Sequence, residues 1–226
     1  MIHAGIIQVR MDSTRLPSKA TKLIMGKPLL WHVINRSLQI GIPIIIATSN
    51  REIDDPIETI AKNCNVSYFR GSYKDVLDRF YQAAKKFNLK RVYRISADTP
   101  LIDPNFCKKM VSFFESNDLD YVRFGFNTVG IGMEGIKFSA LETAWKESVN
   151  DFDREHVTTY IKNHPNKFSS YVIESKYNLG PYHWTVETQE DLTFVNSIFA
   201  EFNNNNFFTE DILALLKEKS YLKKTS

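Results

Sequence analysis

The sequence AGIIQVRMDSTRLPSK, residues 4–19, joins an apolar run to a loop that is rich in cations. Residues 4–9 are almost continuously apolar, which is typical of a strand that is buried on both faces in a parallel sheet. Arg10, Arg15 and Lys19 then follow within ten residues. Arginine binds phosphate oxygens in a bidentate manner and lysine supplies a compact positive charge, so this loop is suited to a triphosphate.

Two interpretations of the loop remain open from its chemistry alone. It could be a solvated basic turn, or a phosphate cradle in which Ser13, Thr14 and backbone N–H groups add donors. Like charges in one loop repel one another unless an anion joins them, and this favours the cradle. The sequence pattern GxxxxGK[ST] of the common P-loop is absent.

The rest of the first half alternates strands with amphipathic helices. This order predicts an α/β fold with a mostly parallel sheet flanked by helices, and with ligands bound beyond the carboxyl ends of the strands. Three polar loops leave those ends and are expected to converge, namely residues 10–19, 48–55 and 97–103. Further strands are predicted at residues 43–48, 66–69 and 91–96, and helices near residues 28–38, 57–64, 77–84 and 104–114.

The second half is less regular. Four glycines between residues 125 and 135 indicate loops or a hairpin, so we expect one domain, residues 1–226, with an inserted hairpin region. Thr209 is expected to cap the last helix, and Thr188 to cap the one before it. Strands are predicted at residues 120–124, 168–173 and 183–186, and helices at residues 139–148, 153–163, 192–202 and from residue 209.

The bulk composition excludes several classes of protein. A net charge of +3 over 226 residues is too small to imply a polyanion such as nucleic acid as partner. No apolar run approaches the length of a membrane span, and no signal peptide is evident, so we expect a cytoplasmic protein. Cys64 and Cys107 belong to no CxxC pair and are expected to be buried, reduced thiols.

A second candidate site is SADTPLID, residues 96–103. Asp98 follows a buried strand, where a carboxylate without a partner is costly, and Mg²⁺ is a natural partner. Asp103 directly precedes Pro104 and is expected to cap the next helix. Glu187 ends another predicted strand and could complete a metal site.

Two further charged clusters are open to a functional or a structural interpretation. Asp75, Asp78 and Arg79 follow Arg70-Gly71-Ser72 and could bind a ligand, or Asp78 and Arg79 could be a solvated helix face. Arg154 and His156 could bind an acidic group or simply pack at the start of a helix.

Together these motifs resemble bacterial sugar cytidylyltransferases. The stretches RMDSTRLPSK, RGSYKDVLDRFYQAA, YRISADTPLIDP, DREHVTTYI and TVETQEDL occur here in the family's order. The resemblance is strongest to the branch of the spore-coat polysaccharide biosynthesis protein F, which is related to acylneuraminate and 3-deoxy-manno-octulosonate cytidylyltransferases. It implies a Rossmann-like nucleotide-diphospho-sugar transferase fold and transfer of CMP from CTP to an acidic sugar for polysaccharide or glycan biosynthesis.

The resemblance also implies roles for individual residues. Arg15, Lys19 and Asp98 are the expected catalytic residues, and Asp98 and Glu187 are the expected ligands of Mg²⁺ or Mn²⁺. The expected nucleotide-binding residues are Gln8, Arg10, Ser13, Arg15, Lys19, Thr48, Arg70, Gly71, Asp75 and Arg79. The acceptor is expected at Glu134, Arg154 and His156, and residues 124–138 are expected to contribute to a homodimer.

Several residues depart from the family pattern. Asp12 and Ser18 replace glycines in the phosphate loop, Glu187 is one methylene longer than the usual aspartate, and Gly132 replaces an aspartate. Asp12 is an acceptable replacement if its backbone is left-handed. A transferase of another nucleotide or of a non-sugar phosphate acceptor, and a catalytically weak nucleotide-binding protein, therefore remain as alternative functions.

Overall fold

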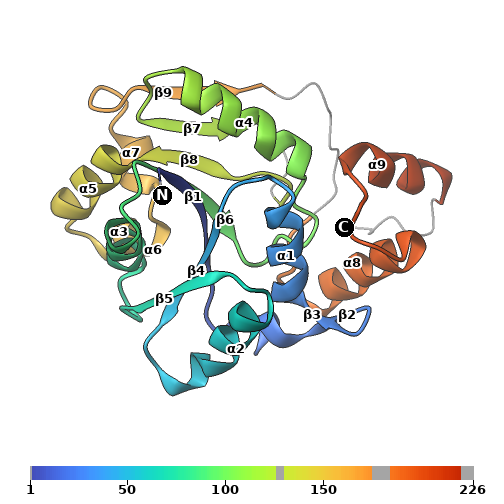
Figure 1. The fold of residues 1–226 in the computed structure, drawn as a ribbon. Coiled ribbons are helices and arrows are strands. Elements are labelled where there is room, and N and C mark those ends of the chain that lie inside the picture. Colours follow the sequence, from blue (N-terminus) through green and yellow to red (C-terminus); the bar gives the residue numbers. More distant parts are fainter. Residues whose placement is uncertain (1, 126–129, 175–183, 220–226) are drawn as a thin grey trace.

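A computed structural model describes residues 2–125, 130–174 and 184–219 of the chain. Its centre is a seven-stranded sheet with the order β5-β4-β1-β6-β8-β7-β9 (Figure 1). All neighbouring strands are parallel except at β8, which runs antiparallel to both β6 and β7. The predicted mostly parallel sheet is therefore confirmed. The strands are β1 His3–Gln8, β4 Ile44–Ser49, β5 Ser67–Gly71, β6 Arg91–Ser96, β7 Tyr121–Phe124, β8 Glu134–Lys137 and β9 Ser170–Ile173.

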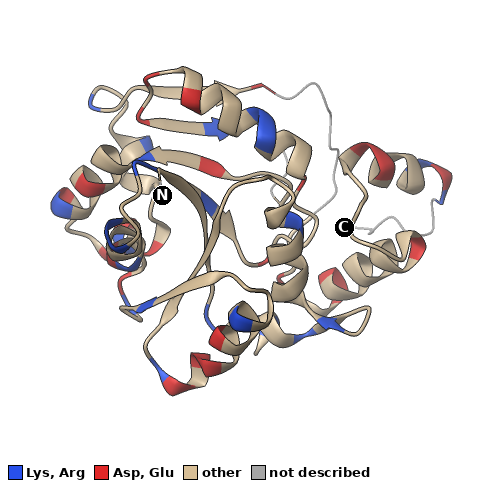
Figure 2. Ribbon diagram, in the orientation of Figure 1, with Lys and Arg blue, Asp and Glu red and all other residues tan. Residues whose placement is uncertain are grey.

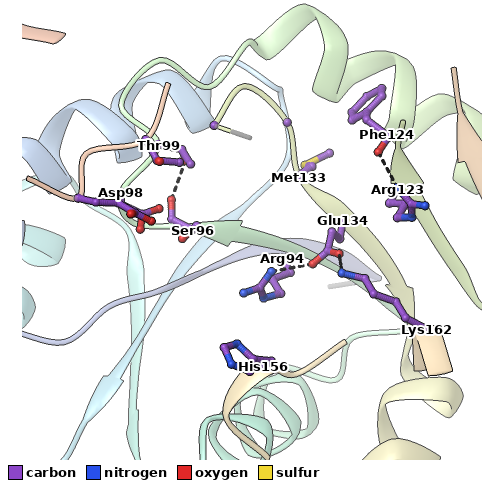
Figure 3. Close-up of a pocket in the computed structure, with 14 residues that line it drawn as sticks. Arg94, Ser96, Asp98, Thr99, Arg123, Phe124, Met133, Glu134, His156 and Lys162 are labelled. Carbon is purple, nitrogen blue, oxygen red and sulfur yellow. Dashed lines mark hydrogen bonds and ion pairs between the residues drawn. The ribbon is translucent and has the colours of Figure 1, made fainter. Parts of the chain in front are cut away.

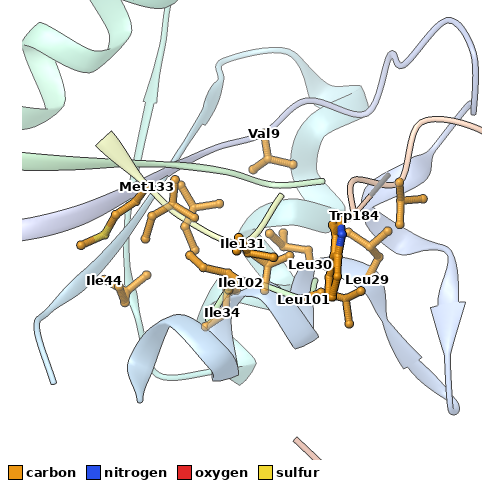
Figure 4. Close-up of a cluster of buried hydrophobic side chains, with 14 of the residues drawn as sticks. Val9, Leu29, Leu30, Ile34, Ile44, Leu101, Ile102, Ile131, Met133 and Trp184 are labelled. Atoms are coloured by element: carbon orange, nitrogen blue, oxygen red, sulfur yellow. The ribbon is translucent and has the colours of Figure 1, made fainter. Parts of the chain in front are cut away.

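Helices cover both faces of this sheet, which explains why its central strands are apolar throughout. In β1, Ile6 packs into one hydrophobic cluster and Ile7 into the other, because successive side chains point to opposite faces. Figure 4 shows part of the larger cluster, which includes Val9, Trp184 and side chains of α1. The helices are α1 Leu29–Leu38, α2 Asp55–Asn63, α3 Val76–Lys86, α4 Pro104–Ser116, α5 Phe138–Glu147, α6 Asp151–His156, α7 Thr159–Asn163, α8 Gln189–Phe202 and α9 Thr209–Glu218.

Residues of both charge signs occur on the outer helices, as Figure 2 shows for α2 and α5. Positive charge is therefore a local feature of this molecule, in agreement with the small net charge of +3. In the described part of the chain, no helix has the length and apolar character that crossing a membrane would require.

The hairpin region is only partly as predicted. Strands β7 and β8 do pair antiparallel, but β8 lies inside the sheet between β6 and β7. A side chain at Gly135 would collide with the Phe114 ring, 2.9 Å from its Cβ position, so α4 packs directly on this strand. Residues 134–137 are thus part of the sheet and not a peripheral insertion, whereas residues 126–129 lie outside the described residues.

Three other predictions about the elements need correction, and one pair of strands was missed. The expected helix at 153–163 is two helices, α6 and α7, separated at Val157, whose φ is 55°. Residues 184–186 are not a strand, and His183 lies outside the described residues. The short antiparallel pair β2 Leu23–Ile24 and β3 Lys27–Pro28 was not predicted. Thr209 begins α9 but does not cap it, since Phe208 is the N-cap residue.

Asp103 fulfils its predicted role as a cap and extends it to a second helix. Its Oδ1 accepts from the backbone N–H groups of Asn105 and Phe106, at 2.8 and 3.2 Å, at the start of α4. Its Oδ2 accepts from the N–H of Thr209 at 2.7 Å, at the start of α9. One buried carboxylate therefore fixes the loop that follows β6 to the last described helix. Thr188 also caps as predicted, in a capping box with Asp191.

Candidate active site

The first and third polar loops meet beyond the carboxyl ends of β1 and β6, as predicted from their positions. They enclose a cavity of about 160 Å³. The second loop supports the first from outside this cavity: Asp54 Oδ1 accepts from the N–H of Met11 at 2.7 Å, and Arg51 pairs with Asp12 at 3.0 Å. The polar side chains that line the cavity are Gln8, Arg10, Asp12, Ser13, Lys19, Ser96 and Asp98.

The cations of the first loop are paired with carboxylates in this structure. Lys19 Nζ lies 3.1 Å from Asp98 Oδ2 and donates to the carbonyl oxygen of Val186 at 2.8 Å. Arg15, whose side chain is 65% exposed, pairs with Glu187. The sequence predicts that an anion joins these cations, and in the structure the two predicted metal ligands, Asp98 and Glu187, supply that negative charge.

The two replacements of glycine in this loop have different backbone geometry. Ser18 has φ 56° and ψ 30°, the left-handed conformation that glycine adopts without strain. Asp12 is not left-handed, so the argument that aspartate tolerates such a backbone does not apply to it. Its carboxylate instead lies 3.6 Å from Arg10 and 3.0 Å from Arg51. Burial opposes ionisation of Asp12, but a hydrogen bond from Tyr73 and these arginines hold its pKa below the usual value.

Three residues that were predicted to bind the nucleotide have structural roles. Arg70 donates to the carbonyl oxygens of Ser49 and Arg51, at 3.0 and 2.7 Å, and pairs with acidic side chains of α2. The side chain of Thr48 is fully buried. A Cβ at Gly71 would lie 2.6 Å from the Phe69 ring, so glycine is required there for packing.

Arg79 occupies a more informative position in a neighbouring cavity of about 180 Å³, which Gln8, Arg10, Glu155 and His156 also line. The side chain is 1% exposed, its Nη1 donates to the Ser72 carbonyl oxygen at 3.0 Å, and its buried Nε has no hydrogen-bond partner. Burial, with the nearby charge of Arg10, lowers the pKa of Arg79 to about 10. A buried guanidinium with a free donor is suited to binding an anion.

Asp75 and Arg154 form an ion pair with each other, away from the cavities. Asp75 caps α3 through the N–H of Asp78 at 2.8 Å, and its other oxygen accepts from Arg154 Nε at 2.8 Å. Arg154 also donates to the Trp145 carbonyl oxygen at 2.5 Å. The pair joins α6 to α3, so Arg154 is not placed to contact an acceptor and the structural interpretation applies to it.

A larger cavity, about 620 Å³, lies over β6, β8 and β7 and adjoins the first one through Ser96 and Asp98 (Figure 3). Two of the predicted acceptor residues, Glu134 and His156, line it. The sequence interpretation missed other polar residues of its lining. The only signal for Arg94 was a charged residue within the otherwise apolar strand RVYRIS. The missed polar and charged residues are Arg94, Thr99, Arg123, Lys162 and Thr185.

Glu134 is the most strongly bound side chain of this cavity. Its carboxylate pairs with Arg94 Nη1 at 2.7 Å and with Lys162 Nζ at 2.6 Å, and it accepts from the Tyr121 hydroxyl. Burial opposes its ionisation, but the charges of Arg94 and Lys162 outweigh burial and lower the pKa of Glu134 to about 2. Glu134 is therefore a charged group at neutral pH whose lone pairs are already in use.

Carboxylates that could hold a metal ion lie at the edge of the larger cavity. Asp98 and Glu187 both line it, and the backbone joins them, since the N–H of Val186 donates to the Asp98 carbonyl oxygen at 2.8 Å. Among the described residues, no group of three or more His, Cys, Asp or Glu side chains is arranged to hold a metal. Two carboxylates are nevertheless the protein ligands that Mg²⁺ commonly uses when phosphates complete its coordination.

Comparison with known proteins gives a consistent result. A family model described as cytidylyltransferase matches residues 4–222. The spore coat polysaccharide biosynthesis protein SpsF of Bacillus subtilis is 30% identical over 203 residues, which cover 86% of this chain and 85% of that protein. An uncharacterised protein of Methanocaldococcus jannaschii is 37% identical over 173 residues, or 75% of this chain and 71% of that protein.

Two solved structures resemble the fold over most of its length. A cytidylyltransferase from Leptospira borgpetersenii superposes with a TM-score of 0.93 and 28% identity, covering 100% of this chain and 98% of that one. A CMP:2-keto-3-deoxy-manno-octonic acid synthetase in complex with CTP superposes with a TM-score of 0.68 and 16% identity, covering 89% and 99%. The second likeness concerns the fold alone.

Proposed function

Because this chain belongs to the cytidylyltransferase family, we propose that it transfers CMP from CTP to an acidic sugar and releases pyrophosphate. The observation that carries the proposal is the position of Asp98, which pairs with Lys19, at the junction of two adjoining cavities, the smaller of which is lined by the cationic loop. Such an arrangement suits two substrates that must meet at one reacting phosphorus.

The nucleotide would occupy the cavities around the first loop. Arg10, Ser13 and Lys19 line one of them and can donate to phosphate oxygens. Arg79, buried with an unused Nε donor, lines the next and can bind a further anionic oxygen. A fold neighbour was solved in complex with CTP, which supports CTP as the nucleotide.

A divalent cation, Mg²⁺ or Mn²⁺, would be held by Asp98 and Glu187. When bound, such an ion neutralises charge on the α-phosphate and favours ionisation of the attacking hydroxyl. Binding it would compete with the present ion pairs of these carboxylates, which join Asp98 Oδ2 to Lys19 and Glu187 Oε2 to Arg15. A cation displaced in this way would be available to the phosphates of CTP.

The chain's own residues would then act on the attacking sugar and on the departing pyrophosphate. A hydroxyl of the sugar, in the larger cavity, attacks the α-phosphorus in line and the bond to the β-phosphate oxygen breaks. Lys19 and Arg15 stabilise the charge that develops on the departing pyrophosphate. No covalent intermediate with the protein is required.

We further propose a role in surface polysaccharide or glycan biosynthesis, which the likeness to SpsF supports. A homodimer also remains a proposal. The expected segment, residues 124–138, would contribute to its interface, and residues 126–129 of it lie outside the described residues. Light scattering at micromolar concentration would test it, since a mass near 26.2 kDa would indicate a monomer.

The reaction can be tested by measuring pyrophosphate release from CTP, UTP, ATP and GTP, each with a pool of acidic sugars and Mg²⁺. Release with CTP and a sugar acid supports the proposal. Release that is fastest with a purine nucleotide, or only with a non-sugar phosphate, supports another transferase. Tight CTP binding without any release would identify a nucleotide-binding protein.

A further inference from the structure

One carboxylate in the larger cavity stands among three cations. Arg94 of β6 and Glu134 of β8 face each other directly in the sheet register, and Lys162 of α7 reaches the same carboxylate. Figure 3 shows Arg94 and Lys162 approaching Glu134 from two sides. On the far side of β8, Val122 pairs with Gly135, so the next residue of β7, Arg123, comes level with Glu134.

The four side chains Arg94, Glu134, Arg123 and Lys162 form a row that is not neutral. Glu134 contributes one negative charge, since its pKa is lowered to about 2, whereas Arg94, Lys162 and Arg123 contribute three positive charges. The other two carboxylates of the lining, Asp98 and Glu187, are already paired with cations of the first loop. Positive charge therefore exceeds negative charge along this side of the cavity, where Arg94 is half-buried and Arg123 and Lys162 are exposed.

Arg123 is the member of the row that is free to bind something else. Its Nη1 donates to the Phe124 carbonyl oxygen at 3.3 Å, which is a long hydrogen bond, and no described carboxylate forms an ion pair with it. Arg94, by contrast, uses Nη1 for Glu134 and directs Nε to Gln8 Oε1 at 3.3 Å. Gln8 lines the cavities on the nucleotide side, so Arg94 joins the two halves of the site.

We infer that Arg123 is the specificity-determining residue of the acceptor site, and that it binds an anionic group, a carboxylate or a phosphate, carried by the sugar. This inference rests on the proposed function. Glu134 is in this account a positioning residue: its carboxylate would repel such a group, but it holds Arg94 and Lys162 in place beside it.

Binding experiments can test this without turnover. The protein is saturated with Mg²⁺ and a non-hydrolysable α,β-methylene analogue of CTP, so that the first loop is occupied. Titration calorimetry then measures 3-deoxy-manno-octulosonate as the carboxylate probe, N-acetylmannosamine 6-phosphate as the phosphate probe and N-acetylmannosamine as the neutral one. The variants are Arg123→Gln, Arg123→Lys and, as a control, Lys137→Gln, which removes a cation of β8 that pairs with Asp118 outside the cavity.

We expect the wild type to bind at least one charged probe more tightly than the neutral one, and the better of the two identifies the anionic group. Arg123→Gln should weaken binding of that probe about tenfold or more, since a charge-assisted contact is lost, and should leave the neutral probe unchanged. Arg123→Lys should restore part of the difference, and Lys137→Gln should behave as wild type.

Two results would overturn the inference: a wild type that does not prefer either charged probe, or an Arg123→Gln variant that keeps the full preference. Failure of the proposed function looks different. In that case no pyrophosphate is released from CTP with any probe, although the anion preference and its dependence on Arg123 are still present.

Discussion

Lys19 Nζ lies 3.1 Å from Asp98 Oδ2, so the cation proposed to bind the phosphates forms an ion pair with the carboxylate proposed to bind the metal. Arg15 and Glu187 repeat this relationship on the same cavity edge. Metal and nucleotide would therefore each release the other's binding group. Their binding should be cooperative, because the first ligand bears the cost of breaking the ion pairs and the second does not.

Substitution of Lys19 by methionine tests this coupling. Lys19→Met frees Asp98, so Mn²⁺ alone should bind about threefold more tightly or better, while CTP binding should weaken about tenfold. Calorimetric titrations of Mn²⁺ and of CTP, each alone and in the presence of the other, measure both effects. Lys22→Met is the control, and a Mn²⁺ affinity that is equal in both variants would contradict the coupling.

Asp98→Asn keeps the volume of the side chain but removes its charge. We expect turnover to fall by about 100-fold or more at fixed Mg²⁺, because a ligand of the catalytic ion is lost. The melting temperature should change little, since a partly exposed ion pair contributes about 0–1 kcal/mol. Turnover near that of the wild type at the same Mg²⁺ concentration would show that Asp98 holds no catalytic metal.

Arg15→Ala separates a phosphate ligand from a structural turn. The pair with Glu187 is largely exposed on the arginine side, so the melting temperature without nucleotide should stay close to that of the wild type. The stabilisation by CTP should decrease by about 1.5–3 kcal/mol, the contribution of a charged hydrogen bond. A large loss of stability without nucleotide, with unchanged CTP affinity, would mean that Arg15 is structural.

The lowered pKa of Glu134 predicts how stability depends on pH. The pKa falls from 4.5 to about 2 on folding, so the charged form stabilises the native state fully above about pH 4.5. This stabilisation is lost as the pH falls toward 2. Glu134→Gln should cost about 3 kcal/mol at pH 7, because Arg94 and Lys162 lose their partner.

Urea unfolding from pH 7 to pH 2.5 measures this contribution. The difference in free energy of unfolding between wild type and Glu134→Gln should be constant from pH 7 to about pH 5 and should shrink below that. A difference that does not change with pH would show that the carboxylate titrates normally.

Ser18→Gly tests the replaced glycines of the first loop. Ser18 has φ 56°, so glycine should relieve strain and stabilise the protein by about 0.5–1 kcal/mol. Asp12→Gly should instead destabilise it by about 1 kcal/mol, since Asp12 is not left-handed and pairs with Arg51 and Arg10. Thermal unfolding of both variants gives the two signs, and a destabilised Ser18→Gly would be the contrary result.

The parts of the fold that could be predicted from sequence are those set by local pattern. The apolar run that forms β1 predicts burial on both faces, and Asp103 before Pro104 predicts the start of a helix. Both signals come from residues that are neighbours in the sequence. β8 lacked such a signal: it is short and has Glu134 and Lys137 at its ends.

The pairing of side chains could not be predicted in the same way. Asp75 and Arg154 are separated by 79 residues, and so are Lys19 and Asp98, so only the folded chain shows that they meet. Arg70 and Arg154 resembled ligand-binding residues in sequence. Their partners in the structure lie on other elements, so only the folded chain shows that the two arginines have structural roles. Arg94 and Arg123 become recognisable as a pair only through the register of β6, β8 and β7.

The double cap at Asp103 has a consequence for how the protein is made. Asp103 and Thr209 are 106 residues apart, so a growing chain on the ribosome can form the first of these caps long before the second. The loop that carries Asp98 would therefore acquire its final anchor only after α9 has emerged. Folding of the nucleotide site should be a late event, even though most of its residues are synthesised first.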